Sequence, residues 1–365
     1  AVPYLGLQVL GEGSVGQGWN TVLTAETHKL NAIGGPSDPT PFATLFTGMI
    51  LANLFYWCTN QYVIQRTLAA RSLAEGQKGV LLSGFFKVLV PLLMMIPGVI
   101  AYHLYGPELH PIDLAYPQLV RDVLPVYATG FFLAVLLGAV LSSFNSLINS
   151  AATLFCIDVY QPWVGRPVTD EALLRTAKRV GLTITAFSLI VAPLLQFAPD
   201  GLWQLIRIFT GFYNIPMIAI VIVGLFTQRV PASAAKLVIV FHIVAYGLFQ
   251  FLFKELLPIH FLHLYAILFV IEVTMMLGMG LWRPRLSPAP LPLEAMVDLT
   301  PWAYGKPCAV TLLSCVVALY VTFSPMGLVA GGSVYFGDIL LSLAALNALL
   351  WLWWYRRLHR EPEAN

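Results

Sequence analysis

Two basic side chains lie inside stretches that are otherwise almost entirely apolar. Lys87 is followed by VLVPLLMMIPGVIAYH, and Arg207 is followed by IFTGFYNIPMIAIVIVGLF. A charge in the hydrocarbon core costs roughly 2.5–3.5 kcal/mol on insertion scales, so such residues usually face a wet cavity or a ligand. The alternative is that each side chain snorkels to an interface, which is easier for Arg207 because it lies nearer the start of its stretch. The pair predicts a wet cavity within the membrane.

Amide and hydroxyl side chains crowd a third apolar stretch, which reads ANLFYWCTNQYVIQR. They are Asn53, Tyr56, Thr59, Asn60, Gln61 and Gln65. Lipid offers no hydrogen-bond partner to these groups, so each must find one within the protein or on a ligand. One interpretation is an unwound or cavity-facing helix whose amides bind a polyhydroxylated ligand, with Tyr56 or Trp57 against a sugar face. The other is hydrogen bonding between helices together with an interfacial aromatic belt.

A long apolar stretch carries a polar stripe in the letters GAVLSSFNSLINSAATLFCID. Its members recur at three- and four-residue spacing and so share one helix face: Ser142, Ser146, Asn149, Ser150 and Thr153, with Ser143 beside them. Paired hydroxyls and carbonyls freed by a local break would suit a hard cation such as Na⁺. A packing seam of small residues, with hydroxyls bonded to the preceding turn, explains the same spacing. The spacing alone leaves both open.

Glu272 is a further charge within an apolar stretch, and we expect it to pair with a neighbouring helix. The histidines are scattered without metal-ligand spacing. The sequence contains no nucleotide-binding loop, nucleophile elbow or HExxH motif. These observations disfavour an enzyme.

Composition is that of a membrane protein. Hydrophobic residues make up 58% and charged residues 10%, with a mean hydropathy of +0.77, whereas soluble domains carry about 25% charge. No basic patch or aromatic platform indicates nucleic-acid binding. We therefore predict an all-α polytopic membrane protein whose partners are a small-molecule solute and the lipid bilayer. The predicted spans are Phe42–Arg66, Val80–Tyr105, Ala128–Tyr160, Val180–Phe197, Leu202–Thr227, Ala234–Leu256, Phe261–Trp282, Cys308–Phe323 and Tyr335–Tyr355.

Basic residues are sorted by side across these nine spans. Only Lys29, Arg121 and Lys254 fall on one side of the membrane, and 15 of the 20 Lys and Arg fall on the other, with Lys87 and Arg207 within the spans. The positive-inside rule then predicts a cytoplasmic C-terminus in a cell (plasma or inner) membrane. Residues 114–124 are expected to form a short amphipathic helix on the outer surface. The span Ala128–Tyr160 is too long for one crossing, so we expect it to tilt, project or break.

The chain begins at Ala1 without Met, and AVPYLGLQVLG resembles the tail of an earlier span. We therefore expect a fragment that lacks upstream helices. Residues 11–41 would be an external loop with at most one short helix.

Three long stretches resemble the sodium:solute symporter family, in its sodium/glucose cotransporter branch. They are ANLFYWCTNQYVIQRTLAARSLAEGQKG, GFFKVLVPLLMMIPGVIAYHLYG and AVLSSFNSLINSAATLFCIDVY. The resemblance is close over Thr40–Tyr160 and is limited to hydropathy and order beyond it. It implies a leucine-transporter-type inverted-repeat fold. Residues 42–227 would be the second repeat of five helices, residues 228–365 would be four peripheral helices with a cytoplasmic tail, and the first repeat would be absent.

The resemblance also implies roles for individual residues. Asn53 and Lys87 match sugar-binding positions of the family, and Tyr56 matches the aromatic residue that gates the sugar from the cytoplasmic side. The metal site for Na⁺ would consist of Ala139, through its backbone carbonyl, Ser142 and Ser143. Na⁺ would be the co-transported ion.

Arg207 departs from the family pattern, because galactose-transporting members carry a glutamine there. Guanidinium is a permanently charged array of donors suited to carboxylates or phosphates. The resemblance therefore predicts Na⁺-coupled uptake of a sugar or sugar-like solute by alternating access, with Arg207 as a fourth solute-binding candidate. The alternatives are a Na⁺ symporter for a carboxylate or another non-sugar solute, and a solute sensor that does not transport.

Overall fold

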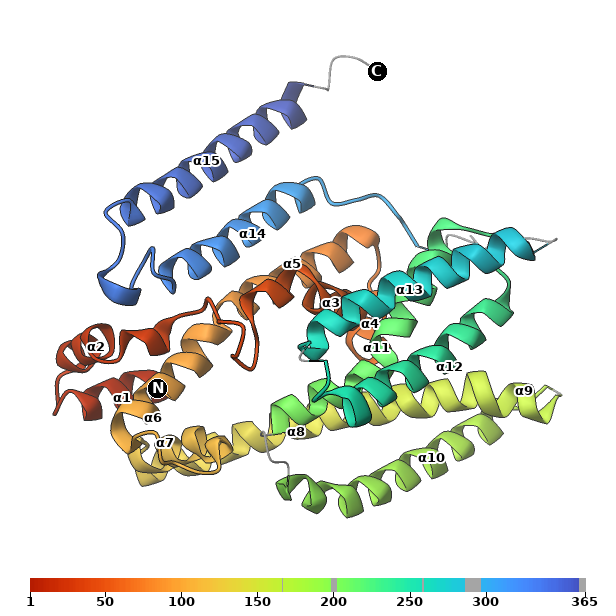
Figure 1. The fold of residues 1–365 in the computed structure, drawn as a ribbon, viewed down its shortest axis with the longest axis horizontal. Helices are drawn as coiled ribbons and strands as arrows, with labels where there is room; N and C mark the ends of the chain where they lie inside the picture. The colour runs from red at the N-terminus through yellow and green to blue at the C-terminus, as the bar shows by residue number, and fades with distance from the viewer. Residues whose placement is uncertain (166, 198–201, 258, 286–296, 361–365) are drawn as a thin grey trace. The chain divides into compact units, whose positions relative to one another are not determined.

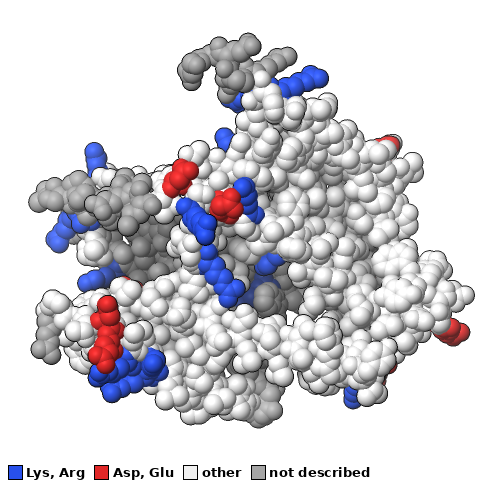
Figure 2. Space-filling model, turned by 180° about the vertical axis from the view of Figure 1, so that it is seen from behind, with Lys and Arg blue, Asp and Glu red and all other residues white. Residues whose placement is uncertain are grey.

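The computed structural model describes residues 1–165, 167–197, 202–257, 259–285 and 297–360, and within them it is almost entirely helical (Figure 1). No β-strand occurs in these ranges, where Ser72 and Asp298 form an isolated bridge. Figure 2 shows a face with few charged groups, as expected of a surface that meets lipid. Eight described helical segments are long and apolar enough to cross a membrane: Leu73–Tyr105, Val126–Val164, Asp170–Leu195, Leu202–Phe226, Ala232–Phe253, Phe261–Trp282, Gly305–Thr322 and Phe336–His359. The protein is an all-α polytopic membrane protein.

The first of the nine predicted spans differs from the other eight, because it is divided. A 3₁₀ turn at Phe42–Phe46 precedes α3 (Gly48–Cys58), and α4 (Gln61–Leu68) follows after a break. At the break, the amides of Thr59 and Asn60 both donate to the carbonyl of Phe55, at 3.0 and 3.1 Å. The 11 residues of α3 extend only about 17 Å, which is shorter than the hydrocarbon core. The unwinding proposed for this polar stretch is therefore present.

The segment that contains Lys87 is bent rather than straight. It comprises α5 (Leu73–Val88), a π turn at Pro91–Met95 and α6 (Ile96–Tyr105). Ser72 caps α5 by accepting from the amide of Glu75. Pro91 has no amide hydrogen, so it cannot complete the helical bond to the carbonyl of Lys87. Lys87 thus lies just before a local irregularity in its span.

The long predicted span is a continuous α-helix across the whole serine stripe. α8 covers Val126–Leu154, and a π turn at Phe155–Tyr160 joins it to α9 (Gln161–Val164). No break frees backbone carbonyls near Ser142 or Ser143. The break that was one of the expectations for this long span is therefore not found at the stripe.

The chain forms two compact units. Unit 1 consists of Ala1–Phe42, Thr67–Thr129 and Leu293–Asn365. In it, α1 (Val2–Leu10) packs against α2 (Val15–Thr24), α6 and α7 (Ala115–Val123), while α14 (Gly305–Thr322) packs against α5 and α15 (Phe336–Arg360). The predicted amphipathic helix at 114–124 is α7, whose buried face contains Leu119, Val120 and Val123.

Unit 2 consists of Ala43–Arg66 and Gly130–Pro292, and includes α10 (Asp170–Val191). Its core is built by α3, α11 (Leu202–Phe226), α12 (Ala232–Leu248) and α13 (Phe261–Trp282), which pack against one another. The buried residues at the centre are Ile215, Tyr246, Phe249, Phe261, Leu262, Leu264, Tyr265 and Leu268. α3 approaches α13 so closely that a Cβ on Gly48 would lie 1.8 Å from the carbonyl oxygen of Leu262.

Candidate solute and sodium sites

Arg207 lies between three helices of unit 2, and its side chain is largely enclosed. The residue is 9% exposed. Its Nη1 donates to Oε1 of Gln204 at 3.3 Å, and its Nη2 lies 3.7 Å from the sulfur of Met49 on α3. The guanidinium carbon is 5.4 Å from the ring centroid of Phe261 on α13, a cation–π distance. These contacts hold the charge among helices, which disfavours the snorkelling alternative.

α3 runs parallel to α11, because Met49 contacts Arg207 while Phe55, six residues later, packs edge-on against Tyr213 with centroids 5.7 Å apart. Asn53 lies one turn after Met49 on α3, and its Nδ2 donates to the Met49 carbonyl at 2.9 Å. The side chain of Asn53 is exposed. Asn53 and Arg207 are thus carried by two helices in direct contact.

Tyr56 lies beside the break between α3 and α4. Tyr62, on α4, donates its hydroxyl hydrogen to the Tyr56 hydroxyl at 3.0 Å, and the two ring centroids are 5.9 Å apart. Trp57 packs edge-on against Tyr56 with centroids 5.4 Å apart. Residues six apart do not meet on a straight helix, so the break creates this aromatic group. The sequence did not single out Tyr62, because the exact position of the break decides which side chain meets Tyr56.

Lys87 belongs to unit 1, whereas Asn53, Tyr56 and Arg207 belong to unit 2. Lys87 is exposed on the last turn of α5. It is fourteen residues from Leu73, the first residue of its helical segment, and so about 21 Å along it. To snorkel to the Leu73 end of the segment, the Lys87 side chain would therefore have to extend over a long distance.

The predicted Na⁺ ligands lie on one exposed turn of α8: Ala139, Ser142 and Ser143. One turn later, the Ser146 hydroxyl donates to the Ser142 carbonyl at 3.0 Å and accepts from Nη2 of Arg66 at 2.8 Å. Thr153 likewise bonds the preceding turn, through the Asn149 carbonyl at 2.8 Å. Ser146 and Thr153 therefore behave as the packing interpretation expects, while Ser142 and Ser143 present hydroxyls at the helix surface.

Glu272 pairs with a neighbouring helix, as its position indicated. Its Oε1 is 2.5 Å from Nδ1 of His242 on α12, and both side chains are fully buried. His242 was assigned no role from the sequence, although a signal existed. His242 lies eleven residues before the end of the segment Ala232–Phe253, and Glu272 lies eleven after the start of Phe261–Trp282. Consecutive antiparallel spans place such positions at the same depth.

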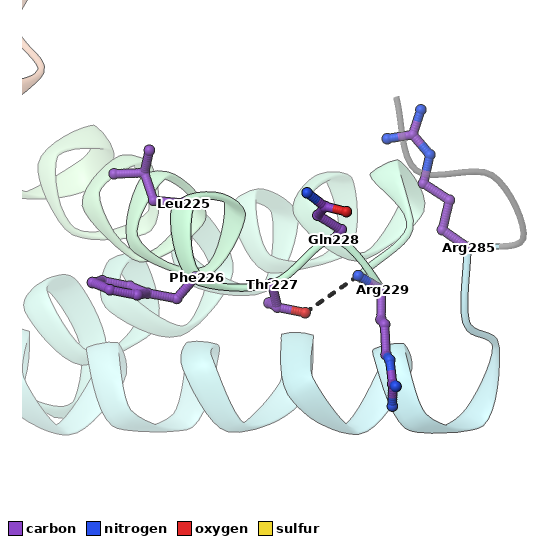
Figure 3. A pocket seen from close by; sticks show the side chains of 6 residues that line it. All are labelled: Leu225, Phe226, Thr227, Gln228, Arg229 and Arg285. Carbon is purple, nitrogen blue, oxygen red and sulfur yellow. Dashed lines mark hydrogen bonds between the residues drawn. The ribbon is translucent and has the colours of Figure 1, made fainter. Parts of the chain in front are cut away.

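A cavity of about 550 Å³ opens near the C-terminal end of α11 (Figure 3). It is lined by Leu225, Phe226, Thr227, Gln228, Arg229 and Arg285. The Arg229 carbonyl accepts from the Arg285 amide at 2.8 Å. The two arginine side chains nevertheless point in opposite directions, so they do not converge on one anion. No predicted site residue lines this cavity, and it carries no functional assignment.

The model of the sodium:solute symporter family matches residues 13–240 of the chain. The chain belongs to this family. It is 43% identical over 326 residues to the uncharacterized symporter YidK of Escherichia coli (strain K12), covering 89% of this chain and 57% of that protein. It is 32% identical over 247 residues to a sodium/glucose cotransporter of Vibrio parahaemolyticus, covering 63% and 45% of the two.

A vertebrate relative gives the same picture. Sodium/glucose cotransporter 1 of Ovis aries is 28% identical over 279 residues, covering 68% of this chain and 42% of the relative. The chain spans about half the length of these curated relatives. Family membership agrees with the resemblance inferred from the three motif stretches, and it describes a transporter family rather than an enzyme family.

Proposed function

We propose that this chain is part of a transporter that couples the entry of Na⁺ to the uptake of a sugar or sugar-like solute by alternating access. The observation that carries the proposal is membership of the sodium:solute symporter family, with relatives named as sodium/glucose cotransporters. The polar groups on α3 and α11 supply what such a solute needs inside a membrane. Because the chain spans about half of its relatives, the proposal concerns the full-length gene product.

Solute binding is assigned to Asn53, Tyr56, Lys87 and Arg207. The exposed Asn53 amide offers both a donor and an acceptor, which suits a hydroxyl-rich ligand. Tyr56, beside the break and braced by Tyr62, offers an aromatic face that closes the inner exit. Lys87 adds a compact cationic donor for solute oxygens.

Na⁺ binding is assigned to Ala139, Ser142 and Ser143. A hard cation prefers several oxygen ligands: Ser142 and Ser143 offer two exposed hydroxyls, and the Ala139 carbonyl, which is bonded within the unbroken helix, would bind through its second lone pair. Ion binding at α8 raises affinity for the solute, and by thermodynamic linkage the solute raises affinity for the ion by the same factor. The cytoplasmic C-terminus and the division into a second repeat, residues 42–227, and peripheral helices, residues 228–365, complete this proposal.

A non-sugar solute is the second candidate, and the surroundings of Arg207 favour it. Its guanidinium is packed against Met49 and Phe261, whose side chains carry no charge. A solute carboxylate at that position would gain a charge-assisted, bidentate interaction that a hexose cannot make. A sensor that binds without transporting is the third candidate.

Radiolabelled uptake into proteoliposomes separates these candidates. The purified full-length protein is given an inward Na⁺ gradient and a competition panel of hexoses, inositols and small carboxylates. We expect Na⁺-driven accumulation of a hexose or inositol. Preferential accumulation of a carboxylate would establish the second candidate, and Na⁺-dependent binding without accumulation would establish the sensor. Uptake that is equal with and without Na⁺ would overturn the proposed coupling.

Lys87 is tested in the same assay with a control on its own helix. Lys87→Ala should raise the KM for solute by about tenfold, as expected for one lost charged hydrogen bond. Lys78→Ala is the matched control, because Lys78 pairs with Glu75 on the exposed surface of α5. Unchanged saturation in Lys87→Ala would remove Lys87 from the site.

A further inference from the structure

The buried pair on α12 and α13 has a defined arrangement of hydrogen atoms. Nε2 of His242 lies 3.0 Å from the carbonyl oxygen of Gly211 on α11. A carbonyl only accepts, so Nε2 must carry the hydrogen and donate it. One further proton is then shared between Nδ1 of His242 and Oε1 of Glu272. With that proton on either atom the pair has no net charge, which suits a fully buried position.

The His242–Glu272 pair is not expected to stabilise the packing of α12 against α13 by itself. The second carboxyl oxygen of Glu272, Oε2, has no hydrogen-bond partner in the part of the chain that the structure describes. Leaving a buried acceptor unsatisfied costs free energy, and apolar residues of similar size often stabilise such a site better. The contact that the pair does secure is the directed hydrogen bond from His242 to α11.

Two tyrosines act on the same part of α11 in the same way. Their hydroxyl hydrogens are donated to backbone carbonyls: Tyr265 to Arg207 at 2.7 Å and Tyr246 to Ile208 at 3.0 Å. With His242, three side chains from α12 and α13 thus bond three carbonyls of one helical turn, those of Arg207, Ile208 and Gly211. That turn begins at Arg207 itself and ends at Gly211.

This turn of α11 lies just before a weak point in the helix. Pro216 lies inside α11 and cannot donate to the carbonyl of Phe212, so the helix loses one internal bond directly after the supported turn. Gly211 permits the close approach, since a Cβ there would lie 2.2 Å from the Tyr265 hydroxyl. The turn that carries Arg207 is thus held by neighbouring helices in addition to its own ladder, next to the position where that ladder lacks one bond.

We propose that His242 and Glu272, together with Tyr265, are positioning residues that orient the Arg207–Gly211 turn of α11 for solute binding. This inference rests on the proposed function, in which Arg207 contacts the solute. His242 and Glu272 touch no solute themselves. They act through the Gly211 carbonyl: Glu272 holds the imidazole at Nδ1 while Nε2 donates to that carbonyl.

The test uses the full-length protein in the uptake assay, with four variants. Glu272→Leu removes the partner of Nδ1, so that the imidazole is held only by its bond to the Gly211 carbonyl. Glu272→Gln is the conservative variant, because its amide donates to Nδ1 and keeps the hydrogen on Nε2. Tyr265→Phe removes only one hydroxyl and serves if Glu272→Leu does not fold. Thr274→Val is the control, because Thr274 is exposed on α13 and bonds its own helix.

We expect Glu272→Leu to raise the KM for solute about tenfold while Vmax per folded transporter stays within about twofold. Tyr265→Phe should raise the KM about threefold, and Glu272→Gln and Thr274→Val should stay close to the parent protein. A merely structural role would lower the amount of folded transporter and leave the KM unchanged. That result, or equal damage from Glu272→Gln and Glu272→Leu, would overturn the proposal.

A second measurement keeps this inference separable from the proposed function. Hydrogen–deuterium exchange of the backbone amides in residues 202–215 reports the rigidity of the turn without any solute. Glu272→Leu should exchange faster there than the parent protein and Thr274→Val should not. Faster exchange with no Na⁺-driven uptake in the parent protein would refute the function alone. Unchanged exchange with normal uptake in the parent protein would refute the positioning role alone.

Discussion

α8 and α11 carry the two halves of the proposed mechanism, yet the structure supports them very differently. In the most apolar stretch of each span, the share of residues that is buried differs: it is 0% in Val126–Val164 and 39% in Leu202–Phe226. Polar side chains on α8 bond to their own helix or to Arg66, which is exposed. The carbonyls of α11 accept from three side chains of two other helices.

The difference shows that polar residues in an apolar span do not all carry the same structural information. At α11, burial, a cation–π contact and three directed hydrogen bonds explain why Arg207 lies where it does. At α8, Ser142 and Ser143 are exposed hydroxyls on an unbroken helix, and their assignment to Na⁺ rests on the family. Variants on each helix can test whether α8 owes its role to its ligands and α11 to its packing.

The largest effect is expected on α8, from Ser143→Ala in the full-length protein. Removing one oxygen ligand should raise the Na⁺ concentration that gives half-maximal uptake by at least about tenfold, with solute transport retained at high Na⁺. Thr153→Val is the matched control, because that hydroxyl already bonds the Asn149 carbonyl. If both variants respond equally to Na⁺, the polar stripe of α8 is a packing feature.

Gly211→Ala tests the packing of α11. The new Cβ would lie 2.2 Å from the Tyr265 hydroxyl, so the residues must shift and the hydrogen bond to Arg207 must change. Overpacking of this kind costs about 1–3 kcal/mol, which should appear as a lower thermal unfolding temperature in detergent. Gly224→Ala, on the same helix, has nothing within 4 Å of its Cβ and is the control. Equal stability of the two variants would contradict the close packing.

A smaller effect is expected from the contact between α4 and α8. Arg66 donates to the Ser146 hydroxyl at an exposed position. A double-mutant cycle with Arg66→Met and Ser146→Ala should give a coupling energy below about 1 kcal/mol. The readout is thermal unfolding of the two single variants and the double variant. A larger coupling would mean that the contact between α4 and α8 is stronger than its exposure suggests.

The smallest effect is expected in unit 1, which provides a reference outside both helices. The hydroxyl of Tyr105 donates to Asp122 on α7 at 2.8 Å, and this bond, with a second from Arg121, holds the pKa of Asp122 below its usual 3.8. A depressed pKa stabilises the folded state above the unfolded pKa, and this contribution is lost as pH falls through the folded pKa. Asp122→Asn should therefore lower stability slightly at pH 7 and match the parent protein at a pH low enough to protonate Asp122 in the folded state. Unfolding curves at the two pH values measure this, and an equal deficit at both would show that charge is not involved.

The sequence predicted the membrane class, eight of the nine spans and α7, because each of these depends on hydropathy and periodicity along the chain. It also predicted that Glu272 would pair between helices, since an isolated charge in an apolar span needs a partner. It did not identify His242, because choosing a partner requires the packing of two helices. Depth counting from the connection between them would have brought the two residues together.

The division of the first span was only partly predictable from the sequence. Amides and hydroxyls at Thr59, Asn60 and Gln61 were compatible with unwinding and with bonding between helices, and periodicity does not distinguish the two. The contacts of Arg207 with other helices could not be predicted from the sequence for a similar reason. Met49 and Phe261 belong to helices far from Arg207 in the sequence, and only the fold brings them around the guanidinium.

The break between α3 and α4 has a mechanical consequence. A continuous helix of the predicted length would transmit a tilt at one end to the other, because its ladder of backbone hydrogen bonds resists bending. Here the ladder stops where Thr59 and Asn60 share the Phe55 carbonyl. α3, which packs closely against α13 at Gly48, can stay fixed while α4 changes its angle. The break would then be a hinge within the membrane.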